Sequence, residues 1–192
     1  NPGMLDYAQN KLKQLKRIDW KQADIANLPF SDAAFNVVLC QFGLMFVPDR
    51  NRAFQEMRRV LVNGGTLAVS VWDRMDANPW GVAVHTTIET LFPDNPPQFF
   101  NAPFNLADVD LLQSLLSANG FDTITIQSVA MECHSSSARS LAIGMIQGSP
   151  MVTEVNDRGG SAELIVDAVA NAFARLGGDS PFRTTMQAIV VT

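Results

Sequence analysis

Two continuous apolar runs, separated by one helix-length segment, constrain the fold of this chain more than any other feature. The first run is FNVVLCQF at residues 35–42, and the second is TLAVSVW at residues 66–72. Neither run alternates with polar residues, which is typical of strands covered on both faces, as in parallel sheets. A strand, a helix and a strand in this order predict a parallel crossover and therefore an α/β fold.

The segment between the two runs begins and ends with residues that are typical of the ends of an amphipathic helix. Asp49 is a natural N-cap, Arg58 and Arg59 suit the negative end of a helix dipole, and Gly64-Gly65 marks the exit. Its apolar residues recur at helical spacing: Ala53, Phe54, Met57, Val60 and Leu61. We therefore expect a helix from about residue 50 to residue 63.

The remaining sequence predicts further elements on both sides of this unit. We expect helices at 4–16, 78–91, 107–119, 136–148 and 159–178, and strands at 17–24, 122–133 and 182–192. Residues 25–34 and 93–105 have the proline and turn residues of loops. No internal repeat or low-complexity tract interrupts the pattern.

Composition excludes several classes of function. The net charge of -5 argues against binding to a nucleic-acid backbone, and no apolar run reaches the roughly 18–20 residues needed for a membrane span. Cys40 and Cys133 lack zinc-site spacing and are interpreted as free thiols of a cytoplasmic protein. His85 and His134 cannot form a metal site by themselves, so we expect no metal.

Ligands of open parallel sheets bind beyond the carboxyl ends of the strands, and Asp24 follows one such predicted strand. A carboxylate there could accept a hydrogen bond from an exocyclic amine, while the backbone N–H of Ile25 donates to a ring nitrogen. Together they would bind the edge of an adenine. The alternative is that Asp24 only caps the following turn, and on spacing alone this is the more frequent role.

A stretch of about fifty residues changes that balance. ADIANLPFSDAAFNVVLCQF, the helix ending RRVLVNGG and the strand TLAVSVW resemble, in order and spacing, the second half of a class I S-adenosylmethionine-dependent methyltransferase. The likeness is strongest to the small-molecule branch that includes the ubiquinone/menaquinone biosynthesis methyltransferases. It implies a Rossmann-like, mostly parallel sheet with an antiparallel last strand, helices on both faces and a small lid insertion.

The resemblance also implies roles for individual residues. Asp24 would bind the adenine amino group of S-adenosyl-L-methionine, and the Ile25 N–H would bind a ring nitrogen. Gln41 would line the methionine end of the cofactor, and Phe42 would border both cofactor and acceptor. Met4 matches a family position that packs on the adenine, although a Met at helical spacing is more often core.

Departures from the family pattern lie mainly upstream. The usual Asp of F-D-V-V is Asn36, and the usual Pro before Gly-Gly is Asn63. The family's glycine-rich loop and its ribose-binding acid have no counterpart in these residues, and in relatives that acid lies directly ahead of a turn like NPGML. The expectation is a single, N-terminally incomplete methyltransferase domain over residues 1–192 that lacks its first strands and leaves a strand edge open.

Acceptor recognition is expected in residues 74–105 and 134–160, an aromatic and apolar lid. Trp72, Trp80 and His85 are the candidate acceptor residues; the alternative is that the aromatic residues form a small second core. A general base, where one is needed, would be His85, His134 or Asp73, and no catalytic residue is assigned.

Three functions are compatible with these residues. The first is methyl transfer to a small, partly hydrophobic molecule by in-line displacement, in a chain that pairs as a homodimer or acts alone. The second is a non-catalytic binding or dimerisation module with the same fold. The third, a nucleotide-binding dehydrogenase, is weakened by the antiparallel-looking final strand and the helix–Gly-Phe–strand tail.

Overall fold

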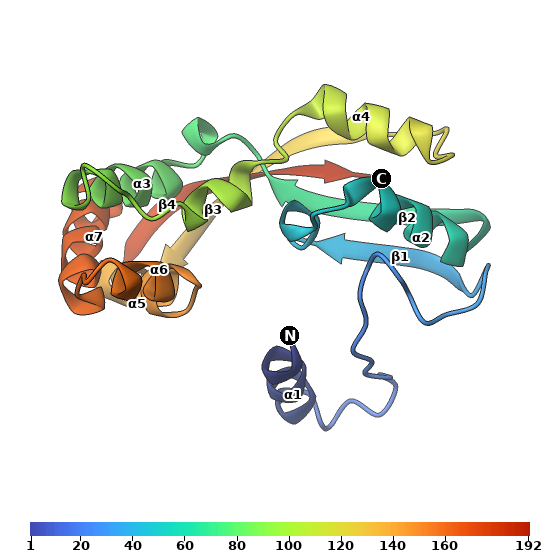
Figure 1. Ribbon diagram of the computed structural model, residues 1–192, viewed down its shortest axis with the longest axis horizontal. Coiled ribbons are helices and arrows are strands. Elements are labelled where there is room, and N and C mark those ends of the chain that lie inside the picture. Colours follow the sequence, from blue (N-terminus) through green and yellow to red (C-terminus); the bar gives the residue numbers. More distant parts are fainter.

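The computed structural model describes residues 1–192, and its centre is a four-stranded sheet with the order β1-β2-β4-β3 (Figure 1). The strands are β1 (Phe35–Gln41), β2 (Leu61–Trp72), β3 (Ile126–Ser135) and β4 (Phe182–Val191). β1 and β2 are parallel, whereas β4 is antiparallel to both β2 and β3. The predicted α/β class with an antiparallel last strand is confirmed, although β1 and β2 form the only parallel pair.

Seven helices accompany this sheet. They are α1 (Pro2–Lys11), α2 (Arg50–Val60), α3 (Pro79–Leu91), α4 (Val109–Ala118), α5 (Ala138–Gln147), α6 (Met151–Asp157) and α7 (Ala162–Gly177). Three short 3-10 turns lie between them: η1 (Leu44–Phe46), η2 (Met75–Ala77) and η3 (Phe99–Phe104). α2 and α4 pack on one face with β2 and β4, and α3 and α7 pack on the other (Figure 1).

The buried side chains divide into two cores. The first joins α2 and α4 to the sheet, and the second joins α3, α5, α6 and α7 around Trp80 and Phe173. Trp72, at the end of β2, packs against both cores. β3 and β4 are long enough to run from the first core into the second, which gives the molecule its two lobes (Figure 1).

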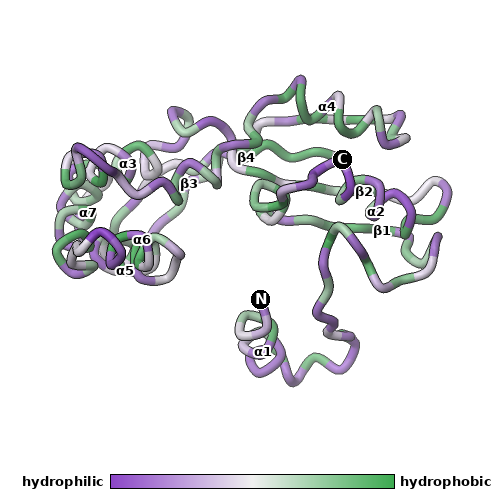
Figure 2. Tube along the Cα trace, in the orientation of Figure 1, coloured by the Kyte–Doolittle hydropathy of each residue, from purple (hydrophilic) through white to green (hydrophobic).

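β1 differs from the prediction that both of its faces are covered. Val38 and Cys40 pack against the first core, but Val37 and Leu39 on the opposite face are 53% and 73% exposed. The reason is that the first core lies against only the Val38 and Cys40 face of β1, and no buried core covers the other face of this edge strand. Figure 2 shows the hydrophobic colour of this strand at the open edge.

The N-terminal region lies apart from the sheet (Figure 1). α1 begins at Pro2, where the Asn1 side chain accepts a hydrogen bond from the Met4 N–H, and it ends at Lys11 rather than at residue 16. The strand expected at 17–24 does not form, because no neighbouring strand is there to pair with it; only an isolated bridge joins Asp24 to Asn27. None of the helices is both long and apolar enough to cross a membrane.

Candidate functional site

β1 and β2 end side by side because they are parallel, and the residues at those ends form the candidate site. Gln41 is the last residue of β1 and is paired with Ser70 of β2. Phe42 follows with a φ of +52°, a left-handed conformation that is rare for a bulky residue. Its N–H donates to the Ser70 carbonyl oxygen at 2.9 Å. Strained backbone of this kind gathers at ligand sites, which makes this turn a functional candidate.

The loop that carries Asp24 leaves two polar groups free. One Asp24 carboxylate oxygen accepts from the Ala26 N–H at 2.9 Å, and the Asp24 carbonyl oxygen accepts from the Asn27 N–H at 3.0 Å. The turn-capping role is therefore real, but it uses one carboxylate oxygen only. The other oxygen and the Ile25 N–H have no hydrogen-bond partner within the chain. Ile25 packs its side chain against the first core, which fixes the position of that N–H.

A buried carboxylate on α2 holds this loop. Glu56 is 2% exposed, and its Oε2 accepts from the Leu28 N–H at 2.8 Å. Arg59 donates to both Glu56 oxygens, at 2.9 and 2.7 Å. These hydrogen bonds from Arg59 outweigh burial and lower the pKa of Glu56 to about 2. Glu56 is thus ionised at neutral pH and serves as a fixed anchor for the loop.

Two arginines of α2 complete the attachment of the loop. Arg59 donates to the carbonyl oxygens of Phe30 and Leu28 at 2.7 and 2.9 Å. Arg52 donates to the Ala26 carbonyl oxygen at 3.1 Å and forms an ion pair with Glu56. The loop is therefore tied at Ala26, Leu28 and Phe30, on the segment that directly follows Asp24 and Ile25.

A chain of aromatic contacts leads from Phe42 into the second lobe. We call Phe42, Trp72, Trp80 and Phe104 the aromatic chain. The Phe42 and Trp72 rings are stacked with centroids 4.4 Å apart, Trp72 meets the edge of Trp80 at 5.3 Å, and Trp80 meets Phe104 at 5.6 Å. Trp80 is 3% exposed and belongs to the second core, so the expected lid aromatics are partly core and partly strand-end surface.

Asn78 fixes the middle of the aromatic chain. Its side chain is fully buried, and its amide donates to the carbonyl oxygens of Asp73, Arg74 and Gln187 at 3.3, 3.1 and 3.1 Å. Its oxygen accepts from the Trp80 indole N–H at 3.2 Å and from the Gln187 N–H at 2.9 Å. All of its hydrogen-bonding groups are used, and they join β2, β4 and α3 at one point.

The Asp73 carboxylate also accepts several hydrogen bonds within the chain. It accepts from the Ser128 hydroxyl at 2.8 Å, the Gln187 side chain at 2.7 Å and the Arg74 N–H at 2.7 Å. Burial raises its pKa, but these three donors outweigh burial and hold the pKa below its usual value. A carboxylate with this environment stabilises the strand ends and is poorly suited to accept a substrate proton.

Comparisons with known proteins agree with this geometry. Residues 1–69 match the methyltransferase-domain family, which covers the Asp24 loop, the Phe42 turn and α2. The demethylmenaquinone methyltransferase of Staphylococcus haemolyticus is 31% identical over 136 residues, 65% of this chain and 56% of that protein. The ubiquinone/menaquinone biosynthesis C-methyltransferase UbiE of Haemophilus ducreyi is 40% identical over 72 residues, 36% of this chain and 28% of that protein.

The fold points the same way. A crystal structure of an S-adenosylmethionine-dependent methyltransferase from Thermotoga maritima superposes with a TM-score of 0.50 at 17% identity, covering 96% of this chain and 67% of that one. The chain is therefore similar to methyltransferases in the sequence of residues 1–69 and in its fold. It spans about half the length, or less, of the curated relatives named above.

The structure brings some of the predicted site residues together and not others. Phe42, Trp72 and Trp80 are in contact, and Gln41 adjoins them. Met4 lies on α1, away from the sheet, and is 73% exposed (Figure 1). The cofactor roles of Met4, Asp24, Ile25, Gln41 and Phe42 remain predictions.

The two histidines lie outside the aromatic chain. His85 Nε2 is 3.2 Å from Glu89 Oε1, one turn along α3. His134 is an exposed residue of β3, paired in register with Arg183. No group of three or more His, Cys, Asp or Glu side chains is placed to hold a metal ion.

Sequence reasoning missed the residues that hold the Asp24 loop and the aromatic chain. The signal for Glu56 and Arg59 is their spacing of three on α2, which places both side chains on one helix face toward the loop. The signal for Asn78 is weaker, because an Asn ahead of a Pro is most simply interpreted as a helix N-cap. Its side chain makes no cap bond and turns inward instead.

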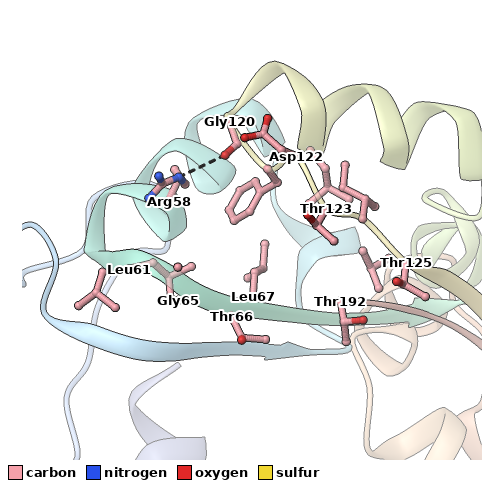
Figure 3. A pocket seen from close by; sticks show the side chains of 16 residues that line it. Arg58, Leu61, Gly65, Thr66, Leu67, Gly120, Asp122, Thr123, Thr125 and Thr192 are labelled. Atoms are coloured by element: carbon pink, nitrogen blue, oxygen red, sulfur yellow. Dashed lines mark hydrogen bonds between the residues drawn. The ribbon is translucent and has the colours of Figure 1, made fainter.

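The cavity in Figure 3 lies at the other end of the sheet. It measures about 450 Å³ and is formed by the start of β2, the end of α4 and the end of β4. Arg58 crosses its rim and donates to the Gly120 carbonyl oxygen at 3.3 Å (Figure 3). None of the predicted methyltransferase site residues lines it, so it is separate from the strand ends that carry Gln41 and Phe42.

Proposed function

We propose that the protein carrying this chain transfers a methyl group from S-adenosyl-L-methionine to a small, partly hydrophobic acceptor. The observation that carries this proposal is the Asp24 turn. A free carboxylate oxygen and the free Ile25 N–H are adjacent there, and the Glu56–Arg59 pair holds the loop that follows. The edge of an adenine carries an amine donor beside a ring-nitrogen acceptor. It therefore matches an acceptor and a donor on successive residues of the chain.

The cofactor supplies a methyl group on a sulfonium sulfur, which is already activated for displacement. The residues of this chain then bind and orient. Asp24 and Ile25 hold the adenine, Gln41 lines the methionine end, and Phe42 with Trp72 forms an apolar border that keeps water from the transferred group. No general base is assigned, because the hydrogen bonds of Asp73 leave it a structural role.

The acceptor class is proposed from two observations. The strand ends carry the stacked rings of Phe42 and Trp72, which are backed by the buried Trp80 rather than by charged side chains. The relatives named above are methyltransferases of quinone biosynthesis. We propose residues 74–105 and 134–160, together with α7, as the lobe that recognises the acceptor, and we propose a cytoplasmic location.

Isothermal titration calorimetry with S-adenosylhomocysteine tests the cofactor. Asp24→Asn is the informative variant, because Asn still caps the turn but presents an amide where the adenine amine needs an acceptor. We expect binding to weaken by about 10- to 100-fold in Asp24→Asn with the unfolding midpoint unchanged. Asp19→Asn, an exposed acid in the same segment, is the matched control.

Two results would contradict the proposal. The first is no binding at millimolar S-adenosylhomocysteine, which would favour the non-catalytic binding module. The second is equal binding by Asp24→Asn and the unmodified protein, which would leave Asp24 with its turn-capping role alone.

A further inference from the structure

The cavity beside Arg58 has the size of a small-molecule site and lies away from the strand ends that carry Gln41 and Phe42 (Figure 3). Its volume of about 450 Å³ is within the range that is typical of sites for small ligands. The buried side chains that line it are apolar and belong to the first core: Leu61, Leu67, Leu116 and Val191. Phe121 and Ile124 add partly buried apolar surface. The interior of this cavity therefore suits an apolar group.

Hydrogen bonds hold the loop that forms one side of the cavity. The Arg58 Nε of α2 donates to the Gly120 carbonyl oxygen at 3.3 Å, where the loop leaves α4. At the other end of the loop, Thr125 and Thr192 exchange two backbone hydrogen bonds of 2.7 and 2.9 Å. Both ends of residues 120–125 are therefore fixed to neighbouring elements, so that binding of a ligand requires little further ordering of this loop.

Two charged side chains of opposite sign line the cavity without pairing with each other. The Arg58 guanidinium makes one hydrogen bond within the chain, through Nε, so its two terminal nitrogens are free to donate as a fork. Asp122 is exposed, and its carboxylate takes part in none of the side-chain hydrogen bonds or ion pairs of the chain. Figure 3 shows both side chains at the rim, on either side of Gly120. Both charges are therefore available to a ligand.

The two charges are close enough for one small molecule to reach both. Arg58 Nε is bonded to the Gly120 oxygen, and Asp122 lies two residues further along, so that the Gly120 and Asp122 Cα atoms are at most about 8 Å apart. In an α-amino acid, the carboxylate, the ammonium group and the side chain diverge from a single carbon atom. Such a molecule presents two acceptors to Arg58, a cation to Asp122 and its side chain to the interior. A simple anion would be repelled by Asp122, and a simple cation would be repelled by Arg58.

We propose that this cavity binds a small zwitterion with an apolar side chain, of the class of the apolar α-amino acids. The carboxylate of the ligand pairs with Arg58, its ammonium group pairs with Asp122, and its side chain lies against Leu67 and Phe121. The inference does not depend on the proposed methyl transfer, because the cavity contains none of the residues to which that function is assigned.

Three probes that share one phenyl group test the proposal by calorimetry at neutral pH and low ionic strength. L-phenylalanine carries both charges, 3-phenylpropanoate lacks the ammonium group, and 2-phenylethylamine lacks the carboxylate. We expect L-phenylalanine to bind to the unmodified protein about 3- to 10-fold more tightly than either of the probes with a single charge.

Two variants separate the two charged contacts. Arg58→Gln is expected to weaken the binding of L-phenylalanine and 3-phenylpropanoate by about 3- to 10-fold without weakening that of 2-phenylethylamine. Asp122→Asn is expected to weaken L-phenylalanine and 2-phenylethylamine by a similar factor without weakening 3-phenylpropanoate. Arg175→Gln and Asp157→Asn remove the same charges at exposed positions outside the cavity and are the matched controls. Circular-dichroism melting checks that each variant is folded.

The unmodified protein must bind L-phenylalanine at about 20 mM, and failure to do so would overturn the proposal. Equal losses for all three probes in either variant, or L-phenylalanine binding that ignores both variants, would overturn it as well. Saturating S-adenosylhomocysteine is expected to leave the affinity for L-phenylalanine unchanged. Competition between these two ligands would place the amino acid in the proposed cofactor site and would contradict the assignment to this cavity.

Discussion

Glu56→Gln is the substitution whose effect the structure defines most sharply. The carboxylate is buried, accepts from the Leu28 N–H, and is bonded twice by Arg59. Glutamine has the same shape and keeps one oxygen acceptor, so it removes the charge without leaving a cavity. The substitution therefore isolates the electrostatic contribution of this one side chain to the attachment of the loop at 24–32.

The magnitude follows from the pKa. The pKa of Glu56 falls from 4.5 to about 2 in the folded protein, chiefly because Arg59 donates to the ionised form. That difference corresponds to at most about 3 kcal/mol of stability at neutral pH. Because the Arg59 side chain is 30% exposed, we expect Glu56→Gln to lower the free energy of unfolding by about 2 kcal/mol.

The sign of the pH dependence is also fixed. A carboxyl group with a lowered folded-state pKa stabilises the protein fully above the unfolded pKa, near 4.5, and loses that contribution as pH falls toward 2. Urea unfolding of both proteins between pH 7 and pH 3 measures this loss. The unmodified protein is expected to lose more stability over that range, so the two curves converge at the acid end.

Hydrogen exchange gives a local measurement of the same effect. The Leu28 amide, whose acceptor is Glu56 Oε2, is expected to exchange faster in Glu56→Gln. Glu89→Gln is the matched control, since the Glu89 side chain is 54% exposed and its loss should cost less than about 0.5 kcal/mol. Parallel stability curves for Glu56→Gln and the unmodified protein would refute the reasoning.

Three further substitutions test other parts of the structure. Asn78→Ala leaves buried donors and acceptors around Gln187 without partners, so it should lower the free energy of unfolding by about 3 kcal/mol in urea unfolding. Gly81→Ala places a Cβ 2.6 Å from the Phe104 ring, so we expect a loss of about 1–3 kcal/mol and an altered near-ultraviolet circular dichroism spectrum. Leu39→Lys, at a 73% exposed edge position, should leave the unfolding midpoint nearly unchanged while raising the solubility limit. Unchanged stability in the first two, or a large loss in the third, would contradict these assignments.

The sequence predicts the elements whose signals are local. The helix at α2 follows from Asp49, whose side chain accepts from the Arg52 N–H, and from its apolar spacing. β2 follows from one continuous apolar run at residues 66–72, but it already begins at Leu61, so the helix expected up to residue 63 ends at Val60 and Gly64-Gly65 lies inside the strand. The strand expected at 17–24 fails because a strand exists only with a partner, which periodicity alone does not supply. The helix boundary at residue 16 was wrong by five residues because α1 lacks a tertiary contact to extend it.

Some residues of the candidate site could likewise be predicted from the sequence, and others could not. Asp24, Gln41 and Phe42 could be chosen from the sequence because they follow strand-like segments at family spacing. The environment of Asp73 could not, because its three donors come from residues 74, 128 and 187. The inward turn of Asn78 has the same origin, since its partner Gln187 lies more than one hundred residues along the chain. Long-range pairs of this kind exist only after the sheet has formed.

Trp72 also has a consequence for how the two halves of the molecule communicate. It is a large side chain that packs against both cores, and it lies directly against Phe42, one residue beyond Gln41. Any tilt of the helical lobe must rotate or slide this indole, and the displacement is delivered to the backbone turn already strained at Phe42. The indole therefore couples the two cores mechanically, so that a movement of the helical lobe changes the turn at the end of β1.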